Sequence, residues 1–222
     1  MEPDMLHTSS TPTLIKALWI ALLAGGFSLF SLWYGGRGQP ISPQDGAELL
    51  ARLEQAYGAT ADDERGFLEH MTRMIPEDDG REFYAVNLER LKAGEAAAEA
   101  DRAYAGIILP LLLKHAAHPV FVSERAGLML GTYGAEVDRV AVVRYRSLRD
   151  MINMVLDPAM KEGEIHKFAA LDHTEVFITR PVISFLHIRL LVGLCLLLIG
   201  LAGLKLIDAV ARRGLRSPGA TG

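Results

Sequence analysis

The chain has 222 residues, half of them hydrophobic, with 23 Lys and Arg against 27 Asp and Glu. A net charge of −4 disfavours a strongly basic nucleic-acid-binding protein. A single cysteine excludes an internal disulfide framework and a zinc site built from cysteines alone. The mean hydropathy of +0.19 is high for a chain in which 23% of the residues are charged. The apolar residues must therefore be concentrated in particular segments.

The first apolar segment runs from residue 14 to residue 34, with Lys16 as its only charged residue. About 20 consecutive apolar residues span a bilayer as a helix, and aromatic residues towards the ends suit the membrane interfaces. A cleaved signal peptide is the alternative. The acidic residues Glu2 and Asp4 ahead of the segment, together with its length, favour a retained anchor. The aromatic residues are Trp19, Trp33 and Tyr34.

The second apolar segment, residues 182–207, is uninterrupted between Leu190 and Leu204. Long cationic side chains near its ends can reach the lipid headgroups. A buried core helix is the alternative, but fifteen uninterrupted apolar residues followed by a basic tail favour a second membrane span. Cys195 lies within this span, so the use of cysteine does not identify the compartment. The polar residues near the ends are His187, Arg189 and Lys205.

The cationic residues near the two spans predict their orientation, because such residues favour the cytoplasmic side. More of them lie on the terminal sides of the spans than on the side of the central region. We therefore expect a multi-pass membrane protein with both termini in the cytoplasm and the central domain outside, which for a bacterial inner membrane is the periplasm. The terminal-side cations are Lys16, Lys205, Arg212, Arg213 and Arg216, and the others are Arg37, Arg180 and Arg189.

Two helices are predicted at the start of the central region. Ser42 and Pro43 are typical of a helix cap and a first helical position, and Gly58 ends the apolar pattern that follows. A second helix is expected to begin at Thr60, with Asp62 and Asp63 in its first turn, and to end before Pro76.

Beyond Gly80 the apolar pattern alternates between strand and helix periods. A helix over residues 95–115 contains Pro110, which we expect to kink it. Ser147 is placed to cap a later helix. The predicted strands are 83–88, 120–129, 137–145 and 174–179, and the later helices are 148–156 and a short piece over 166–171.

The predicted order of strand, helix, strand, strand, helix and strand is the ferredoxin-like βαββαβ arrangement, an α+β fold. One face of its sheet carries the helices. The other needs a cover, either a second copy of the chain or the two preceding helices. The expected organisation is an N-terminal tail (1–13), a first transmembrane helix (14–35), a helical linker (36–80), the ferredoxin-like domain (81–181), a second transmembrane helix (182–207) and a basic C-terminal tail (208–222).

The central region is acidic, because residues 37–181 hold 17 Lys and Arg against 24 Asp and Glu. A partner with a phosphate backbone is therefore not expected.

Several short motifs within residues 82–180 carry a family resemblance. They are Asn87-Leu88-x-Arg90, Tyr104, Pro119-Val-Phe121, the run from Asp138 to Ser147, and His166-Lys167-x-Ala169-Ala170-Leu171. With these motifs the region resembles a bacterial family of unknown function in the dimeric α/β-barrel superfamily, which also includes small monooxygenases and haem-binding proteins. The resemblance implies a dimer and a cleft between helices and sheet, but no established reaction.

The chain departs from that family at several positions. Val137 replaces a Trp, Ala116-Ala117 replaces a Gly-Gly pair, and Arg146 replaces a Pro. Two membrane spans are also not typical of the family.

Asn87, Arg144 and His166, with Lys167 beside it, are the candidate catalytic residues if the cleft binds an apolar acid or a phenol. An arginine presents a fixed fork to a carboxylate, and a histidine titrates near neutral pH and can move a proton. The alternative is that Arg144 pairs with a neighbouring carboxylate and His166 is an exposed helix residue.

Metal and cofactor sites are weakly indicated. The spacing of His115 and His118 would allow two metal ligands, joined by His173 and Glu175, but histidines at a helix end more often bond carbonyl groups or face solvent. We expect no metal. We expect no cofactor either; a haem is the minor alternative, held by His115, His118, His166 or His173 as the superfamily resemblance implies. No phosphate-loop, Gly-x-Ser-x-Gly or His-Glu-x-x-His motif occurs.

The function that these observations favour is a membrane-anchored binding or assembly module. Its expected partners are the lipid bilayer, reached through two helices, a second copy of the chain and other membrane proteins. One alternative is a small-molecule enzyme of the dimeric α/β-barrel type, monooxygenase-like or haem-dependent. The other is an accessory subunit of a larger membrane complex. Glycines of the second span would allow close helix contact; they are Gly193, Gly200 and Gly203.

Overall fold

The computed structural model describes residues 10–58, 66–183 and 187–215. It divides into two compact units, residues 1–33 with 183–222 and residues 34–182. The expected helix start at Thr60, with Asp62 and Asp63, lies outside the described residues, as do Glu2, Asp4 and Arg216.

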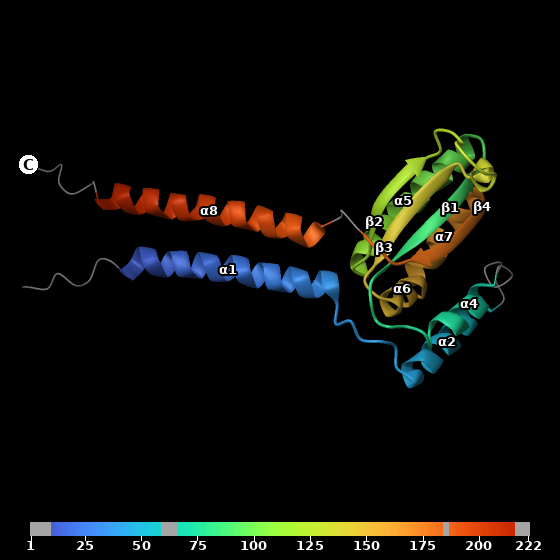
Figure 1. The fold of residues 1–222 in the computed structure, drawn as a ribbon, viewed down its shortest axis with the longest axis horizontal. Coiled ribbons are helices and arrows are strands. Elements are labelled where there is room, and N and C mark those ends of the chain that lie inside the picture. The colour runs from blue at the N-terminus through green and yellow to red at the C-terminus, as the bar shows by residue number, and fades with distance from the viewer. Residues whose placement is uncertain (1–9, 59–65, 184–186, 216–222) are drawn as a thin grey trace, which may run out of the picture. The chain divides into compact units, whose positions relative to one another are not determined.

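The first unit contains two long helices, α1 (Ser10–Gly35), whose last two residues belong to the second unit, and α8 (Ile188–Leu215) (Figure 1). Among the described residues, these two helices are long and apolar enough to cross a membrane. The indole Nε1 of Trp19 donates a hydrogen bond of 3.4 Å to the carbonyl oxygen of Gly200. Lys16 forms an ion pair with Asp208. Because residues early in α1 meet residues late in α8, the two helices run antiparallel.

Three glycines of α8 face large side chains of α1, and the fit is tightest at Gly203. A Cβ atom added to Gly203 would lie 2.4 Å from Nε1 of Trp19, which is closer than atoms can pack. A Cβ at Gly193 would lie 3.5 Å from its nearest neighbour, an ordinary contact. The glycines therefore allow α1 and α8 of the same chain to approach closely, as small residues do between membrane helices. The facing pairs are Gly193 with Phe27, Gly200 with Leu23 and Gly203 with Trp19.

The second unit contains a four-stranded antiparallel sheet, with the strand order β2-β3-β1-β4 in its described residues. Together with the helices that connect the strands, this order is the ferredoxin-like arrangement, and it confirms the predicted α+β fold. The elements are β1 (Phe83–Leu91), α5 (Glu95–Lys114), β2 (His118–Glu124), β3 (Arg139–Tyr145), α6 (Leu148–Val155), α7 (Pro158–Ala170) and β4 (Leu171–Thr179).

Within the domain, strand β2 and helix α7 differ most from their predicted bounds. Strand β2 ends at Glu124 rather than at residue 129, and the chain then turns through Gly131, whose φ of +80° suits glycine. Helix α7 is longer than the expected piece over 166–171. It begins at Pro158 because the side chain of Asp157 accepts a hydrogen bond from the main-chain N–H of Ala159 and caps the helix.

The helices α2 (Pro43–Tyr57) and α4 (Phe67–Met74) precede the sheet. Helix α2 starts as predicted, since the Ser42 side chain accepts a hydrogen bond from the main-chain N–H of Asp45. The Tyr57 hydroxyl donates to the carbonyl oxygen of Val155 at 2.8 Å and lies 2.7 Å from a carboxylate oxygen of Glu164. These bonds join α2 to α6 and α7.

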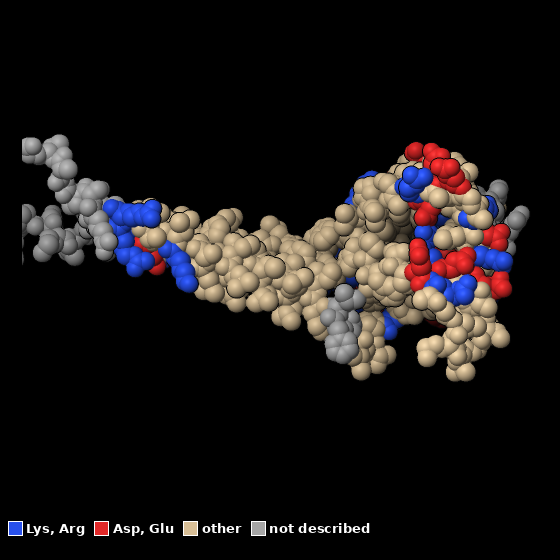
Figure 2. Space-filling model, turned by 90° about the horizontal axis from the view of Figure 1, so that it is seen from above, with Lys and Arg blue, Asp and Glu red and all other residues tan. Residues whose placement is uncertain are grey.

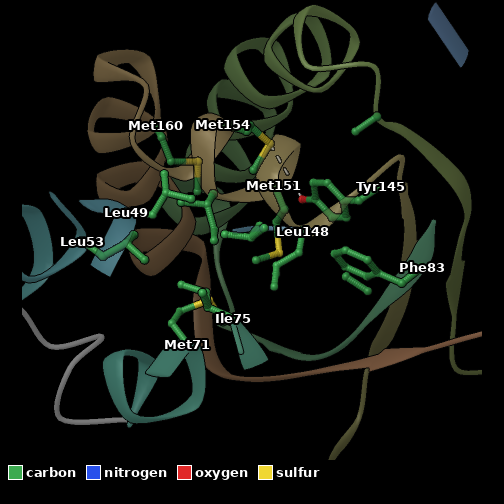
Figure 3. Close-up of a cluster of buried hydrophobic side chains, with 14 of the residues drawn as sticks. Leu49, Leu53, Met71, Ile75, Phe83, Tyr145, Leu148, Met151, Met154 and Met160 are labelled. Atoms are coloured by element: carbon green, nitrogen blue, oxygen red, sulfur yellow. Dashed lines mark hydrogen bonds between the residues drawn. The ribbon is translucent and has the colours of Figure 1, made fainter. Parts of the chain in front are cut away.

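One core holds the sheet and its helices together (Figure 3). Phe83 of β1 and Tyr145 of β3 stack with their ring centroids 5.5 Å apart. Each fully buried side chain of this size contributes about 1.5–3 kcal/mol. The five α-helices described in this unit all add side chains to this core, including α2 and α4. The helical residues include Leu49, Leu53, Met71, Leu111, Leu112, Met151, Ile152 and Met160.

The pairing register separates the two faces of the sheet, because successive strand residues point to opposite sides. Phe83 pairs with Tyr145 on the core side, so the next pair, Tyr84 with Arg144, lies on the opposite side. We call these the helix face and the open face. Helices α2 and α4 pack into the core, and this excludes the expectation that they cover the open face.

Candidate functional site

Arg144 lies on the open face but is almost completely buried, with 1% of its surface exposed. Its Nε donates to a carboxylate oxygen of Glu82 at 2.9 Å, and its Nη2 donates to the carbonyl oxygen of Tyr34, also at 2.9 Å. The guanidinium carbon lies 3.7 Å from the centre of the Tyr34 ring. Arg144 therefore has the paired role that the sequence left as the alternative to substrate binding.

Tyr34 explains why an arginine is buried here. Its carbonyl group lies in the last turn of α1, where carbonyl groups lack partners within the helix. His118 joins the same cluster: its Nε2 lies 3.3 Å from the Tyr34 hydroxyl, and the two rings stack at 5.7 Å. Burial, followed by the charge of Glu82, raises the pKa of Tyr84 beside them. The cluster joins the chain ahead of α2 to the sheet.

Asn87 and His166 lie on the other side of the sheet from Arg144. Asn87 pairs with Ala141 on the helix face, and its Nδ2 donates to the Ala141 carbonyl oxygen at 3.1 Å. His166 is half-buried on α7, which packs on the helix face. The structure therefore does not bring Asn87, Arg144 and His166 together. The physical reason is the two-residue period of the strands, which places Asn87 and Arg144 on opposite faces.

The histidines proposed as metal or haem ligands have separate partners. His115 Nε2 lies 3.3 Å from a carboxylate oxygen of Asp157, whereas His118 contacts Tyr34. In the described part of the chain, no group of three or more His, Cys, Asp or Glu residues is arranged to hold a metal ion. His173 is exposed on the open face and His166 lies on the helix side, so the candidate haem ligands do not share one site.

An ion cluster on the helix face was not predicted. Nε of Arg139 donates to Glu89 at 2.6 Å, and its two terminal nitrogens donate to Asp101 of α5 at 2.7 and 2.8 Å. These bonds raise the pKa of Arg139, and those that it donates to Asp101 contribute most. Glu89 is 4% exposed. All three guanidinium nitrogens of Arg139 donate to the two carboxylates. The cluster therefore links α5 to the sheet.

Two other polar groups lie on the helix face near this cluster. Burial raises the pKa of Tyr104, with further contributions from Tyr145 and Glu89. Thr174, which pairs with Glu89 across β4 and β1, has a buried hydroxyl oxygen without a hydrogen-bond partner among the described residues. The sequence signal for the Arg139 ion cluster is a pair of opposite charges, Glu89 and Arg139, on two strands. It identifies a pair only once the register places Glu89 opposite Arg139.

One apolar row crosses the open face through all four strands. Phe121 of β2 pairs with Val142 of β3, Val142 pairs with Val86 of β1, and Val86 pairs with Phe177 of β4. The phenylalanines at the two edges are 50% and 45% exposed. The row has large side chains at its edges and smaller ones at its centre. The order of side-chain sizes is therefore the same in both directions. A second row beside it adds Val140 and Leu88.

No protein-family model matches the chain, and no curated protein matches it. Solved structures of similar fold include a protein of unknown function from Rhodopseudomonas palustris, with 22% identity over 52% of this chain and 94% of that chain and a TM-score of 0.47. A dimeric ferredoxin-like protein of unknown function from Jannaschia sp. has 10% identity over 45% of this chain and 99% of that chain, with a TM-score of 0.37. A putative antibiotic biosynthesis monooxygenase from Bacteroides thetaiotaomicron has 11% identity over 48% and 95%, with a TM-score of 0.36.

The Jannaschia protein is described as dimeric and ferredoxin-like, and both it and the Rhodopseudomonas protein are of unknown function. The fold of this chain rests on its own strand order.

Proposed function

We propose that the chain is a membrane-anchored assembly module. Helices α1 and α8 hold it in a bilayer, and the domain pairs with a second copy through its open face. The observation that carries the proposal is the apolar row Phe121, Val142, Val86 and Phe177. Two-fold symmetric dimers use one self-complementary patch on both copies. A row with large residues at both edges and small residues at its centre suits such a patch.

The energy of this contact is of the right size for pairing at a membrane. A Phe side chain carries about 200 Å² of surface, so roughly 100 Å² of Phe121 and of Phe177 remains exposed. At about 25 cal/mol per Å², burying four such side chains in a dimer contributes about 10 kcal/mol. Association costs about 4–15 kcal/mol. The remainder is supplied by the neighbouring aliphatic residues and by confinement to one bilayer, which raises the effective concentration of the partner.

The positions of the candidate catalytic residues support assembly over the enzyme alternative. Arg144 is occupied by Glu82 and Tyr34, and Asn87 and His166 lie across the sheet from it. A hollow beside Phe83 and Ile178 holds only about 100 Å³, whereas ligand sites commonly measure about 300–1,000 Å³.

The test is the mass of the full chain after purification in a mild detergent, measured by light scattering with correction for bound detergent. The expected result is a dimer without a chromophore. A monomer at all concentrations would contradict pairing through the open face. A stoichiometric complex with a different protein would indicate the accessory-subunit alternative, and a bound chromophore would indicate an enzyme. Both of these outcomes count against the proposal.

A further inference from the structure

An apolar groove runs between α1 and α8 near the end where α1 begins and α8 ends. Its volume is about 400 Å³, within the range of about 300–1,000 Å³ that is common for ligand sites. Gly203 contributes no side chain to the groove, and the Trp19 indole packs directly against it. The wall is formed by Ile15, Leu18, Trp19 and Leu22 of α1 and by Gly203 and Leu206 of α8.

Cationic residues gather at this end of the helix pair (Figure 2). Asp208 pairs with Lys16. Within the described part of the chain, the exposed residues Lys205, Arg212 and Arg213 have no acidic partner. The described residues at this end of the helix pair therefore carry an excess of positive charge, which attracts anionic headgroups.

Arg213 is the cation that continues the line of the groove. It follows Leu206 by seven residues, and seven residues make almost two turns, so both lie on the same side of α8. At 1.5 Å per residue, Arg213 lies about 10 Å further along the helix. Arg212 carries the same charge but lies roughly 120° around the helix from the line of Leu206. Arg212 is therefore a natural control for Arg213.

We propose that this groove binds one anionic phospholipid, with an acyl chain against Trp19 and Leu206 and the phosphate on Arg213. The inference rests on the membrane location that the proposed function assumes. A planar guanidinium bonds two phosphate oxygens at once. The apolar wall leading up to that cation fits an acyl chain, so the two features select a phospholipid rather than free phosphate.

The test uses the tryptophans as probes. The full chain is placed in bilayers of phosphatidylcholine with a fifth of phosphatidylglycerol, and bromine is carried on the acyl chains of one lipid at a time. Trp33→Phe leaves Trp19 as the reporter of the groove, and Trp19→Phe leaves Trp33 as the reporter of the other end of α1. We expect brominated phosphatidylglycerol to quench Trp19 more strongly, per mole of lipid, than brominated phosphatidylcholine does.

Variants at the two arginines locate the phosphate. Arg213→Gln should lower the preference of Trp19 for the anionic lipid about fivefold, which corresponds to one cation near the membrane surface. Arg212→Gln should leave most of that preference. Equal effects of the two variants, or no preference in the parent, would overturn the proposal. Quenching of Trp33 without quenching of Trp19 would mean that protein fills the groove, which overturns the lipid site but leaves the anchor. If neither tryptophan is quenched, membrane anchoring itself fails.

Discussion

The guanidinium of Arg144 lies 2.9 Å from the carbonyl oxygen of Tyr34, although 110 residues separate them along the chain. The same side chain donates to Glu82 and covers the Tyr34 ring. One buried arginine thus satisfies a helix-end carbonyl, balances a carboxylate and packs on an aromatic face. This combination requires the planar fork of arginine, because a lysine offers only a compact charge.

We therefore predict that Arg144→Lys destabilises the domain by about 2 kcal/mol, since the carbonyl of Tyr34 or the carboxylate of Glu82 loses its partner. Thermal unfolding of the full chain in detergent measures the effect. Arg90→Lys is the control, because Arg90 is exposed and exposed pairs contribute at most about 1 kcal/mol. Equal effects of the two substitutions would contradict the role assigned to Arg144.

The fold could be predicted from the sequence because helix caps and the spacing of apolar residues depend only on nearby residues. The change from helical spacing to alternation placed the strands near their observed bounds, and Ser42 and Ser147 cap their helices as predicted. The predicted end of strand β2 was too late because residues 126–129 are apolar after the strand ends, and apolar content alone does not distinguish a strand from an exposed turn.

The arrangement of the candidate site residues could not be predicted from the sequence, because it depends on pairing between distant segments of the chain. Asn87 and Arg144 were grouped as candidate residues of one cleft, but whether they share a face depends on the register, which pairs Arg144 with Tyr84 and Asn87 with Ala141. The burial of Arg144 depends on Tyr34, which no periodicity connects to β3. Sequence spacing also leaves open whether Glu89 lies opposite Arg139.

The open face offers neighbouring residues that differ only in the side of the sheet. Phe177 points to the open face, and the preceding residue, Val176, points to the helix face with similar exposure. We predict that Phe177→Lys converts the dimer to a monomer and that Val176→Lys leaves the dimer intact. The masses of both variants in detergent measure the outcome. A loss of pairing in both would show that the interface is not the open face.

The same comparison is available on β2, at the other end of the row. Phe121→Lys should abolish pairing, and Val122→Lys should preserve it, because Val122 pairs with Ala141 on the helix face. Light scattering across a range of protein concentrations makes the test quantitative. A dimer that survives Phe121→Lys would restrict the contact to the β4 side of the sheet.

The helix pair depends on Gly203. We predict that Gly203→Ala separates α1 from α8 locally, because its Cβ would lie 2.4 Å from the indole of Trp19. Gly193→Ala should be tolerated, since its Cβ would meet Phe27 at 3.5 Å. The measurement is disulfide formation between Leu23→Cys and Gly200→Cys, with Cys195→Ser in all variants. Unchanged cross-linking in Gly203→Ala would mean that Trp19 moves aside without cost.

Asp157 gives the domain a predictable sensitivity to acid. A hydrogen bond from Lys114, followed by that from the main-chain N–H of Ala159, lowers the pKa of Asp157 to about 2. The ordinary value for the unfolded chain is 3.8. The stability contributed by this carboxylate is therefore fully present above about pH 4 and is lost as the pH falls towards 2.

The substitution Asp157→Asn isolates this charge, because asparagine still accepts the capping hydrogen bond of α7. We predict that the variant melts at a lower temperature than the parent at pH 5 and that the difference closes as the pH approaches 2. Thermal unfolding at half-unit pH steps measures this. Asp45→Asn serves as the comparison and should produce a smaller difference, because the pair of Asp45 with Arg149 is exposed to solvent. A difference for Asp157→Asn that stays constant from pH 5 to pH 2 would show that packing, rather than charge, determines the contribution of Asp157.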